Sequence, residues 1–374
     1  MPGRVSDWLQ AHRMALITCF LLFALSRIVI LTPAYLLFSS SDPPPAPAWY
    51  LPNHQGVLVS EPWNMLTLYD STHYLKIAQE GYRDSHEVLW YPLYPGLIRA
   101  FGASPWSGIF VSNLLFFIGL LALYRIGGKL PVALACFAPI SFLFSAVYGE
   151  SLFFALIAWF LVALKENRII SAGILAGLAA CSRAPGVVLP LFLGLLFFWR
   201  LGQAENQRWP AIKPWLASLG LAGVLGLAYP VFLWLAFGSP FEMAAHQTAY
   251  RNLMPFWWGT VTDVSRLFGN HPADAGVILL NLLGLVWIGI SLLDRETRWL
   301  ALLYALLILS FPVTRSSIPV ALHGLIRYAM VWPAGYLWIA RTATNRYAFS
   351  AILAVFVILS IMVGQILAVK SFVM

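Results

Sequence analysis

The chain has 374 residues, of which 60% are hydrophobic and 10% are charged, and its formal net charge is +8. Soluble globular domains carry roughly 25% charged residues, so this composition excludes a large soluble α-helical protein. It indicates instead a helical protein that crosses the membrane several times. A basic excess is also found in nucleic-acid-binding proteins, but in a membrane protein the positions of the charges decide their meaning.

Apolar windows follow one another along almost the whole chain. The first follows two arginines, as the core of a signal peptide would, but it is too long for such a core and we expect a retained transmembrane helix. Together the windows predict an all-α polytopic membrane protein in which 1–374 form a single transmembrane domain. They number about eleven: 14–37, 106–124, 131–147, 151–164, 169–182, 185–199, 215–237, 275–293, 299–312, 323–340 and 347–369.

Several windows between 131 and 199 are shorter than the roughly 20 residues that a straight span needs. Glycine and proline interrupt them, as at Pro139, Gly149 and Gly186. Interrupted helices are tolerated at membrane depth where they are buried in protein or line a cavity. We therefore expect this region to form the wall of a cavity.

The basic residues predict the orientation of the chain. With the N-terminus in the cytoplasm, the cytoplasmic segments hold 13 of the 23 lysine and arginine residues and five acidic residues. This asymmetry follows the positive-inside rule and accounts for the basic excess, so no nucleic-acid partner is expected. Two long loops, 39–105 and 238–272, then lie on the non-cytoplasmic side, and their many aromatic residues are typical of the membrane interface.

The first of these loops contains LYDSTHYLKIAQEGY, which we expect to be a helix over 68–82. Its spacing puts Asp70, His73 and Tyr74 on one face. A structural interpretation is open, since Thr67 and Asp70 have the spacing of a capping box. A functional one is equally compatible with the sequence, because a carboxylate at a membrane surface can act as a general base.

Five stretches occur in order along most of the chain: YDSTHYLKIAQEGY (69–82), WYPLYPGLIRAFG (90–102), SAVYGESLFFAL (145–156), AGLAACSRAPGVVL (176–189) and GLIRYAMVWP (324–333). Together they resemble the GPI mannosyltransferase II family and its prokaryotic relatives, which have the GT-C glycosyltransferase fold. In two positions this chain differs from the usual pattern, with Tyr69 and His73 where the family has tryptophan. A third difference is Ser182 and Ala184 around Arg183, where the family often has Thr-Arg-Pro.

The resemblance implies an inverting transfer of a hexose, usually mannose, from a polyprenyl-phosphate donor to a lipid-linked or protein acceptor on the non-cytoplasmic face. Such a displacement needs one general base and stabilisation of the leaving phosphate. Asp70 aligns with the family's essential acid and is the expected base. No cofactor is expected, and a divalent cation, which some enzymes of this fold use, has no paired D-x-D motif beside Asp70 to support it.

Three arginines are candidates for binding the leaving phosphate. Arg183 lies at the outer end of a span, where an arginine also commonly reaches for lipid headgroups. Arg327 lies inside an apolar run, so we expect it either to bind the phosphate or to pair with an acid such as Glu150. Arg315 is the third candidate.

Further substrate-binding candidates surround the expected base. His73 and Lys76 are near enough to contact phosphate or a metal ion, although His73 also fills the volume of the family's tryptophan. Tyr74 and Tyr328 lie in two of the matching stretches.

The remaining candidates each have a structural alternative. Glu150 is expected at the outer start of a helix, which acids favour. Tyr91 and Tyr94 belong to a rigid proline-containing element that would cover the site. Trp257 and Trp258 are expected either to stack on a sugar or lipid tail or to belong to an interfacial aromatic belt.

Three other functions remain open at the level of sequence. A lipid flippase or transporter would share the many helices, but it normally shows internal repeats, and none is apparent. An enzyme of the same fold with polyprenyl-phosphate glucose or an aminosugar as donor differs only in substrate. A non-catalytic membrane scaffold is the third. The expected location is a bacterial plasma membrane or the endoplasmic reticulum membrane.

Overall fold

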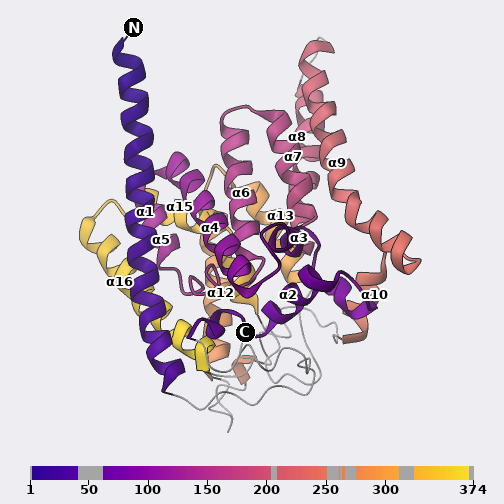
Figure 1. The fold of residues 1–374 in the computed structure, drawn as a ribbon. Coiled ribbons are helices and arrows are strands. Elements are labelled where there is room, and N and C mark those ends of the chain that lie inside the picture. The colour runs from indigo at the N-terminus through magenta and orange to yellow at the C-terminus, as the bar shows by residue number, and fades with distance from the viewer. Residues whose placement is uncertain are drawn as a thin grey trace.

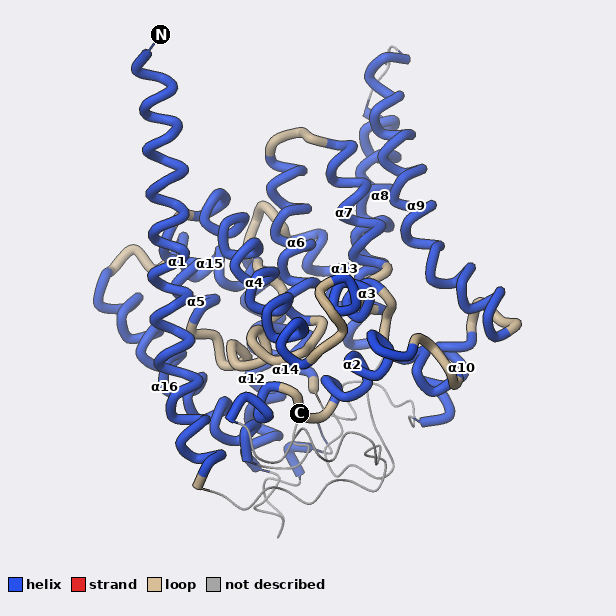
Figure 2. Tube along the Cα trace, viewed as in Figure 1, coloured by secondary structure: helices blue, strands red, loops and turns tan. Residues whose placement is uncertain are grey.

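A computed structural model describes residues 2–40, 62–203, 209–250, 261, 263–265, 275–310 and 324–369. These residues form helices joined by turns, with no strand among them (Figures 1 and 2). The N-terminal half contains α1 (Pro2–Ser39), η2 (Pro62–Leu66), α2 (Asp70–Glu80), η3 (Ser85–Leu89), α3 (Leu93–Ala100), α4 (Pro105–Gly127), α5 (Lys129–Cys136), α6 (Glu150–Lys165) and α7 (Ile169–Ala180). The remainder contains η4 (Ala184–Val187), α8 (Val188–Gln203), α9 (Trp209–Phe237), α10 (Glu242–Tyr250), α12 (Ala275–Leu293), α13 (Arg298–Ser310), α14 (Leu325–Met330), α15 (Ala334–Thr342) and α16 (Arg346–Val369).

Five helical segments in the described part of the chain are long and apolar enough to cross a membrane. Their surfaces expose many large apolar side chains, as lipid-facing helices do, and the protein is an all-α polytopic membrane protein. The five segments are Arg13–Ser39, Pro105–Gly127, Ala184–Gly202, Ile212–Phe237 and Arg346–Ala368.

Within the described residues, at least two of the eleven apolar windows are broken near their middle. In the window 131–147, α5 ends at Cys136, and the chain continues to Gly149 as turns and bends that are buried throughout. The window 323–340 is divided between α14 and α15 by a break that includes Pro333. The expected interruption at Pro139 is confirmed, and Figure 2 shows the interrupted segment as a loop packed among helices.

A buried arginine of α1, which the sequence had not singled out, holds this non-helical segment. The guanidinium of Arg27 donates hydrogen bonds to the carbonyl oxygen of Ser141, at 2.9 Å, and to Oγ of Ser145, at 2.6 Å. It also donates to the carbonyl oxygen of Cys136, the last residue of α5. Because a charge inside a membrane protein needs polar partners, these contacts fix the segment that leads into α6.

The segments predicted to be cytoplasmic lie together at one end of the molecule. Arg125 of α4 forms an ion pair with Glu166, which follows α6. Arg341 of α15 contacts Asp294 and Glu296, which follow α12. Figure 1 shows the N-terminus of α1, the α6–α7 turn and the adjoining ends of α8 and α9 at the same end, whereas α2 and α3 lie far from it.

Glycines allow the helices behind this arrangement to approach closely. A β-carbon built on Gly173 of α7 would lie 2.3 Å from the carbonyl oxygen of Ser218 in α9, and α7 and α9 are in extensive contact. At Gly186 in η4, the same construction places the β-carbon 1.9 Å from the carbonyl oxygen of Ala179. The η4 backbone therefore rests directly on the end of α7, which is the usual reason for glycine in helix contacts within membranes.

Replacing Gly186 with alanine is expected to lower stability by at least about 3 kcal/mol, because the added methyl group would overlap backbone that cannot rotate away. The matched control is Gly194→Ala in α8, where a β-carbon meets nothing within 4 Å. Alanine there favours the helix by roughly 0.5–1 kcal/mol. Thermal unfolding of the purified variants in detergent measures both changes, and equal midpoints for the two variants would contradict the close contact.

Candidate functional site

Asp70 is the first residue of α2, and it follows a sharp turn of the backbone. Tyr69, just before it, has φ 58° and ψ −121°, a backbone conformation that residues other than glycine rarely adopt. The expected capping box with Thr67 is wrong. The Tyr69 turn separates Thr67 from the helix, and the Thr67 hydroxyl donates to the carbonyl oxygen of Asn64 at 3.1 Å. The Asp70 carboxylate is therefore not engaged as a helix cap and is available to other groups.

Through Arg327, the Asp70 side chain is linked to residues from distant parts of the sequence. Arg327 donates from Nη2 to Oδ2 of Asp70 at 2.9 Å. The same guanidinium contacts Oε1 of Glu150 through Nε, at 2.9 Å, and through Nη2, at 2.8 Å. Nη1 of Arg183 lies 2.7 Å from the same Glu150 oxygen. Asp70, Arg327, Glu150 and Arg183 thus form one chain of ion pairs, called the charged cluster below.

The four members differ in exposure. The side chain of Glu150 is fully buried, with 0% of its surface exposed, whereas that of Asp70 is 24% exposed. Arg183 and Arg327 are nearly buried, at 9% and 11%. Two guanidinium groups therefore share one inaccessible carboxylate, and the accessible end of the cluster is Asp70.

Each arginine of the cluster also lies against a tyrosine ring. The guanidinium carbon of Arg327 is 4.8 Å from the ring centroid of Tyr148, and that of Arg183 is 4.8 Å from the ring of Tyr328. Such contacts favour a cation and restrict the plane of the guanidinium. Tyr328 was a candidate from the sequence, but Tyr148 was not, although it stands two residues before Glu150 in one of the five stretches.

Local structure explains how these side chains are positioned. Glu150 is the first residue of α6, where a carboxylate interacts favourably with the helix dipole, as expected. Arg183 lies in extended backbone between α7 and η4, and its carbonyl oxygen accepts a hydrogen bond from the Gly186 amide. Arg327 lies in α14, which Tyr304 of α13 holds by donating its hydroxyl hydrogen to the Tyr328 carbonyl oxygen at 2.7 Å.

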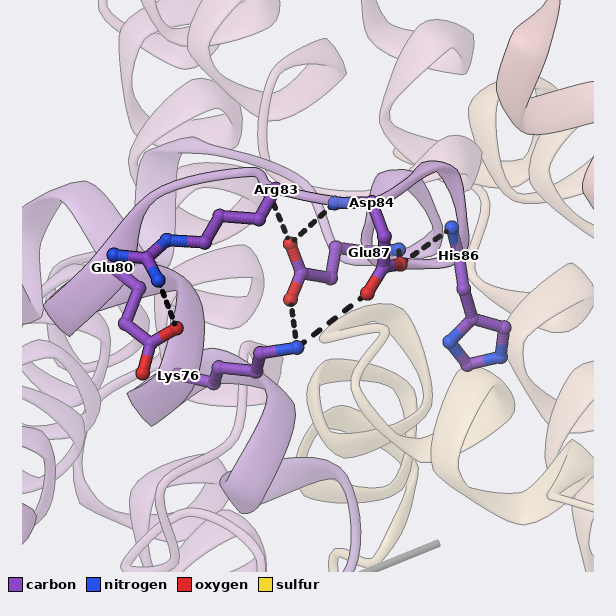
Figure 3. Close-up of polar contacts among 6 residues, drawn as sticks. All are labelled: Lys76, Glu80, Arg83, Asp84, His86 and Glu87. Atoms are coloured by element: carbon purple, nitrogen blue, oxygen red, sulfur yellow. Dashed lines mark hydrogen bonds and ion pairs between the residues drawn. The ribbon is translucent and has the colours of Figure 1, made fainter. Parts of the chain in front are cut away.

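Lys76 does not join the charged cluster. Its ammonium contacts Oε1 of Glu87 at 2.5 Å and Oδ2 of Asp84 at 3.5 Å (Figure 3). The other oxygen of Glu87 accepts from the amides of Arg83 and Asp84, and the hydrogen bond to Glu87 raises the pKa of Lys76. Lys76 therefore ties α2 to η3 and keeps the helix that carries Asp70 in place.

His73 also contacts the segment around η3. Its ring stacks on Trp90, with centroids 3.7 Å apart and planes inclined by 15°. His86 lies beside both rings. Burial lowers the pKa of His73 from 6.5 to about 4, so the imidazole is neutral at physiological pH.

The His73 pKa predicts a pH dependence of stability. Between pH 6.5 and about 4, the unfolded chain binds a proton at His73 that the folded protein does not, so stability falls as the pH is lowered through this window. His73→Phe keeps a flat ring on Trp90 and removes this contribution. Thermal unfolding measured across the window should show a smaller loss for the variant, whereas above pH 6.5 the two proteins should share the same pH dependence. Parallel curves throughout would contradict the burial of a neutral imidazole.

Three tyrosines of the first loop, all predicted site residues, have packing roles. Tyr74 and Tyr94 are buried and pack edge to face, with centroids 4.9 Å apart. The hydroxyls of Tyr94 and Ser112 are hydrogen-bonded to each other. Tyr91 packs on Tyr229 of α9. These contacts connect α2 and α3 to the transmembrane helices, and they leave Tyr91 as the least enclosed of the three.

Other expectations cannot be placed in this arrangement. Trp257, Trp258 and Arg315 lie outside the described residues. Within the described ranges, no three His, Cys, Asp or Glu side chains are grouped so that they could hold a metal ion. Of the site residues predicted from the sequence, the structure brings together Asp70, Glu150, Arg183, Arg327 and Tyr328.

Three comparisons with known proteins were made. No protein-family model matches the chain, and searches of curated proteins and of solved structures also found no match.

Proposed function

We propose that this protein is an inverting glycosyltransferase of the GT-C type. It moves a hexose, with mannose as the preferred sugar, from a polyprenyl-phosphate donor to a lipid-linked or protein acceptor on the non-cytoplasmic face of the membrane. The observation that carries the proposal is the charged cluster. In it, the accessible carboxylate of Asp70 lies 2.9 Å from the guanidinium of Arg327, which also contacts the buried Glu150.

The cluster contains the two functions that such a displacement requires. The acceptor oxygen forms a bond to the anomeric carbon while the bond from that carbon to the phosphate oxygen breaks. Asp70 takes the proton of the acceptor hydroxyl, and the leaving phosphate keeps the bonding electron pair. Arg327 and Arg183 stabilise the negative charge that develops on the phosphate, since buried guanidinium groups bind phosphate strongly.

The position of the cluster supports the sidedness. It lies at the start of α6, whereas the basic turn after α6 lies with the N-terminus of α1 at the other end (Figure 1). The positive-inside rule assigns that basic end to the cytoplasm, so the cluster is assigned to the opposite face. A polyprenyl chain can then remain in the outer half of the bilayer while its phosphate reaches the two arginines.

The proposal is tested with the full-length protein reconstituted in lipid vesicles. Radiolabelled polyprenyl-phosphate mannose is supplied with a membrane lipid extract, and the products are separated and analysed for a new glycosidic bond with inverted configuration at the anomeric carbon. The same assay with polyprenyl-phosphate glucose tests the alternative donor. Movement of the donor across the bilayer without a new glycosidic bond would reject the enzyme and favour a flippase.

A further inference from the structure

The two carboxylates of the charged cluster are held very differently. Glu150 is fully buried, and its Oε1 receives contacts from both arginines at 2.7 to 2.9 Å. Asp70 is partly exposed, and its side chain has one polar contact among the described residues, from Nη2 of Arg327 at 2.9 Å. An exposed single contact contributes much less than a buried pair, so Asp70 is the partner of Arg327 that can be exchanged.

This contact constrains the proposed role of Asp70. The Arg327 guanidinium engages Oδ2 and holds the carboxylate towards itself, so only Oδ1 can meet an acceptor hydroxyl while the pair lasts. Among the described residues, Arg327 and Arg183 make fewer contacts than their N–H groups can make. Both guanidinium groups therefore have N–H groups that a substrate phosphate could engage.

We infer that the donor phosphate replaces Asp70 on Arg327 and thereby frees the base. Arg327 keeps Glu150 and the Tyr148 ring throughout, and only the contact of its Nη2 with Asp70 is replaced. The donor consequently binds before the acceptor is activated, and Asp70 stays turned towards Arg327 when no donor is present. This inference rests on the proposed function and adds to it an order of binding and a positioning role for Arg327.

The exchange predicts that removing the charge of Asp70 improves phosphate binding. In Asp70→Asn, the phosphate no longer competes with a carboxylate for Arg327, and we expect the affinity for farnesyl phosphate to rise about five- to tenfold. The probe is farnesyl phosphate added to the full-length protein in detergent, and uncharged farnesol reports the contribution of the isoprenoid chain alone. The matched control is Glu80→Gln, which removes the same charge from the same helix at a residue whose ion pair in the described part of the chain is with Arg83.

A double-mutant cycle separates exchange at Arg327 from a general electrostatic effect. If Asp70 acts through this arginine, the gain in affinity on Asp70→Asn disappears in the Arg327→Gln background. If Arg327→Gln does not fold, Arg327→Lys is used, because one ammonium cannot hold Glu150 and Asp70 as the guanidinium does, and the gain should shrink there. A gain of unchanged size in either background overturns the inference.

The results for the inference and for the proposed function are distinguishable. Equal or weaker binding of farnesyl phosphate by Asp70→Asn overturns the exchange alone. Binding of farnesyl phosphate by the wild-type protein no tighter than that of farnesol overturns the phosphate-lipid donor and, with it, the proposed function. Tighter binding by Asp70→Asn that depends on Arg327 supports the exchange.

Discussion

Asp70→Asn is expected to lower the rate of sugar transfer by about 10²- to 10⁴-fold, the contribution that a general base usually makes. Asparagine has the shape of aspartate but cannot take the proton of the acceptor hydroxyl. The fold should survive, because Arg327 retains both of its contacts to the buried Glu150. The measurement is the initial rate of glycosidic bond formation in vesicles at saturating donor, together with the thermal unfolding midpoint.

Glu80→Gln is the control for this substitution as well. Glu80 lies at the other end of α2 and pairs with the exposed Arg83, so its charge can be removed without touching the cluster. Its transfer rate should equal that of the wild-type protein. A transfer rate in Asp70→Asn within a few-fold of wild type would refute the assignment of the base, whereas loss of the folded protein would show that Asp70 is structural.

Glu150→Ala is expected to have the largest effect on stability, about 3–5 kcal/mol. The substitution leaves two nearly buried guanidinium groups next to each other without the carboxylate that neutralises them. Such a loss exceeds what most point substitutions cause and could prevent accumulation of the protein. Thermal and denaturant unfolding in detergent measure it, with the amount of folded protein as a second readout.

The control for Glu150 is at the opposite end of the same helix. Glu166, which follows α6, also contacts two arginines, Arg125 and Arg168, but these side chains are 43% and 62% exposed. Glu166→Ala should therefore cost no more than about 1 kcal/mol, as exposed ion pairs usually do. Similar losses for the two variants would show that burial does not decide the strength of the Glu150 pairs.

That this is a helical membrane protein could be predicted from the sequence, because membrane insertion depends on the hydrophobicity and charge of short stretches of chain. Each apolar window and each cluster of basic residues acts within a short stretch of chain, and the structure has long apolar helices with the basic turns together at one end. The interruption after Cys136 was also a local prediction, since glycine and proline act on their own backbone. The capping box at Thr67 failed because the strained Tyr69 turn intervenes, and spacing alone does not report backbone angles.

The candidate functional site could be predicted from the sequence only in part. The sequence singled out Asp70, Glu150, Arg183 and Arg327 one by one, from acids and arginines in unfavourable surroundings and from resemblance to a family. It suggested the pair of Arg327 with Glu150 as one of two alternatives, and this pair is present. It also offered Lys76 as a residue that could contact phosphate or a metal ion, and in the structure Lys76 pairs with Glu87.

What the sequence by itself determined is a helical membrane protein with a carboxylate in its first long loop. The tertiary structure decided which groups that carboxylate meets. Arg327 is 257 residues from Asp70 in sequence and 177 from Glu150, and Arg27 reaches a segment more than a hundred residues away. Contacts over such separations follow from how whole helices pack and from the cost of leaving a charge without a partner, and neither is a property of a local stretch of sequence.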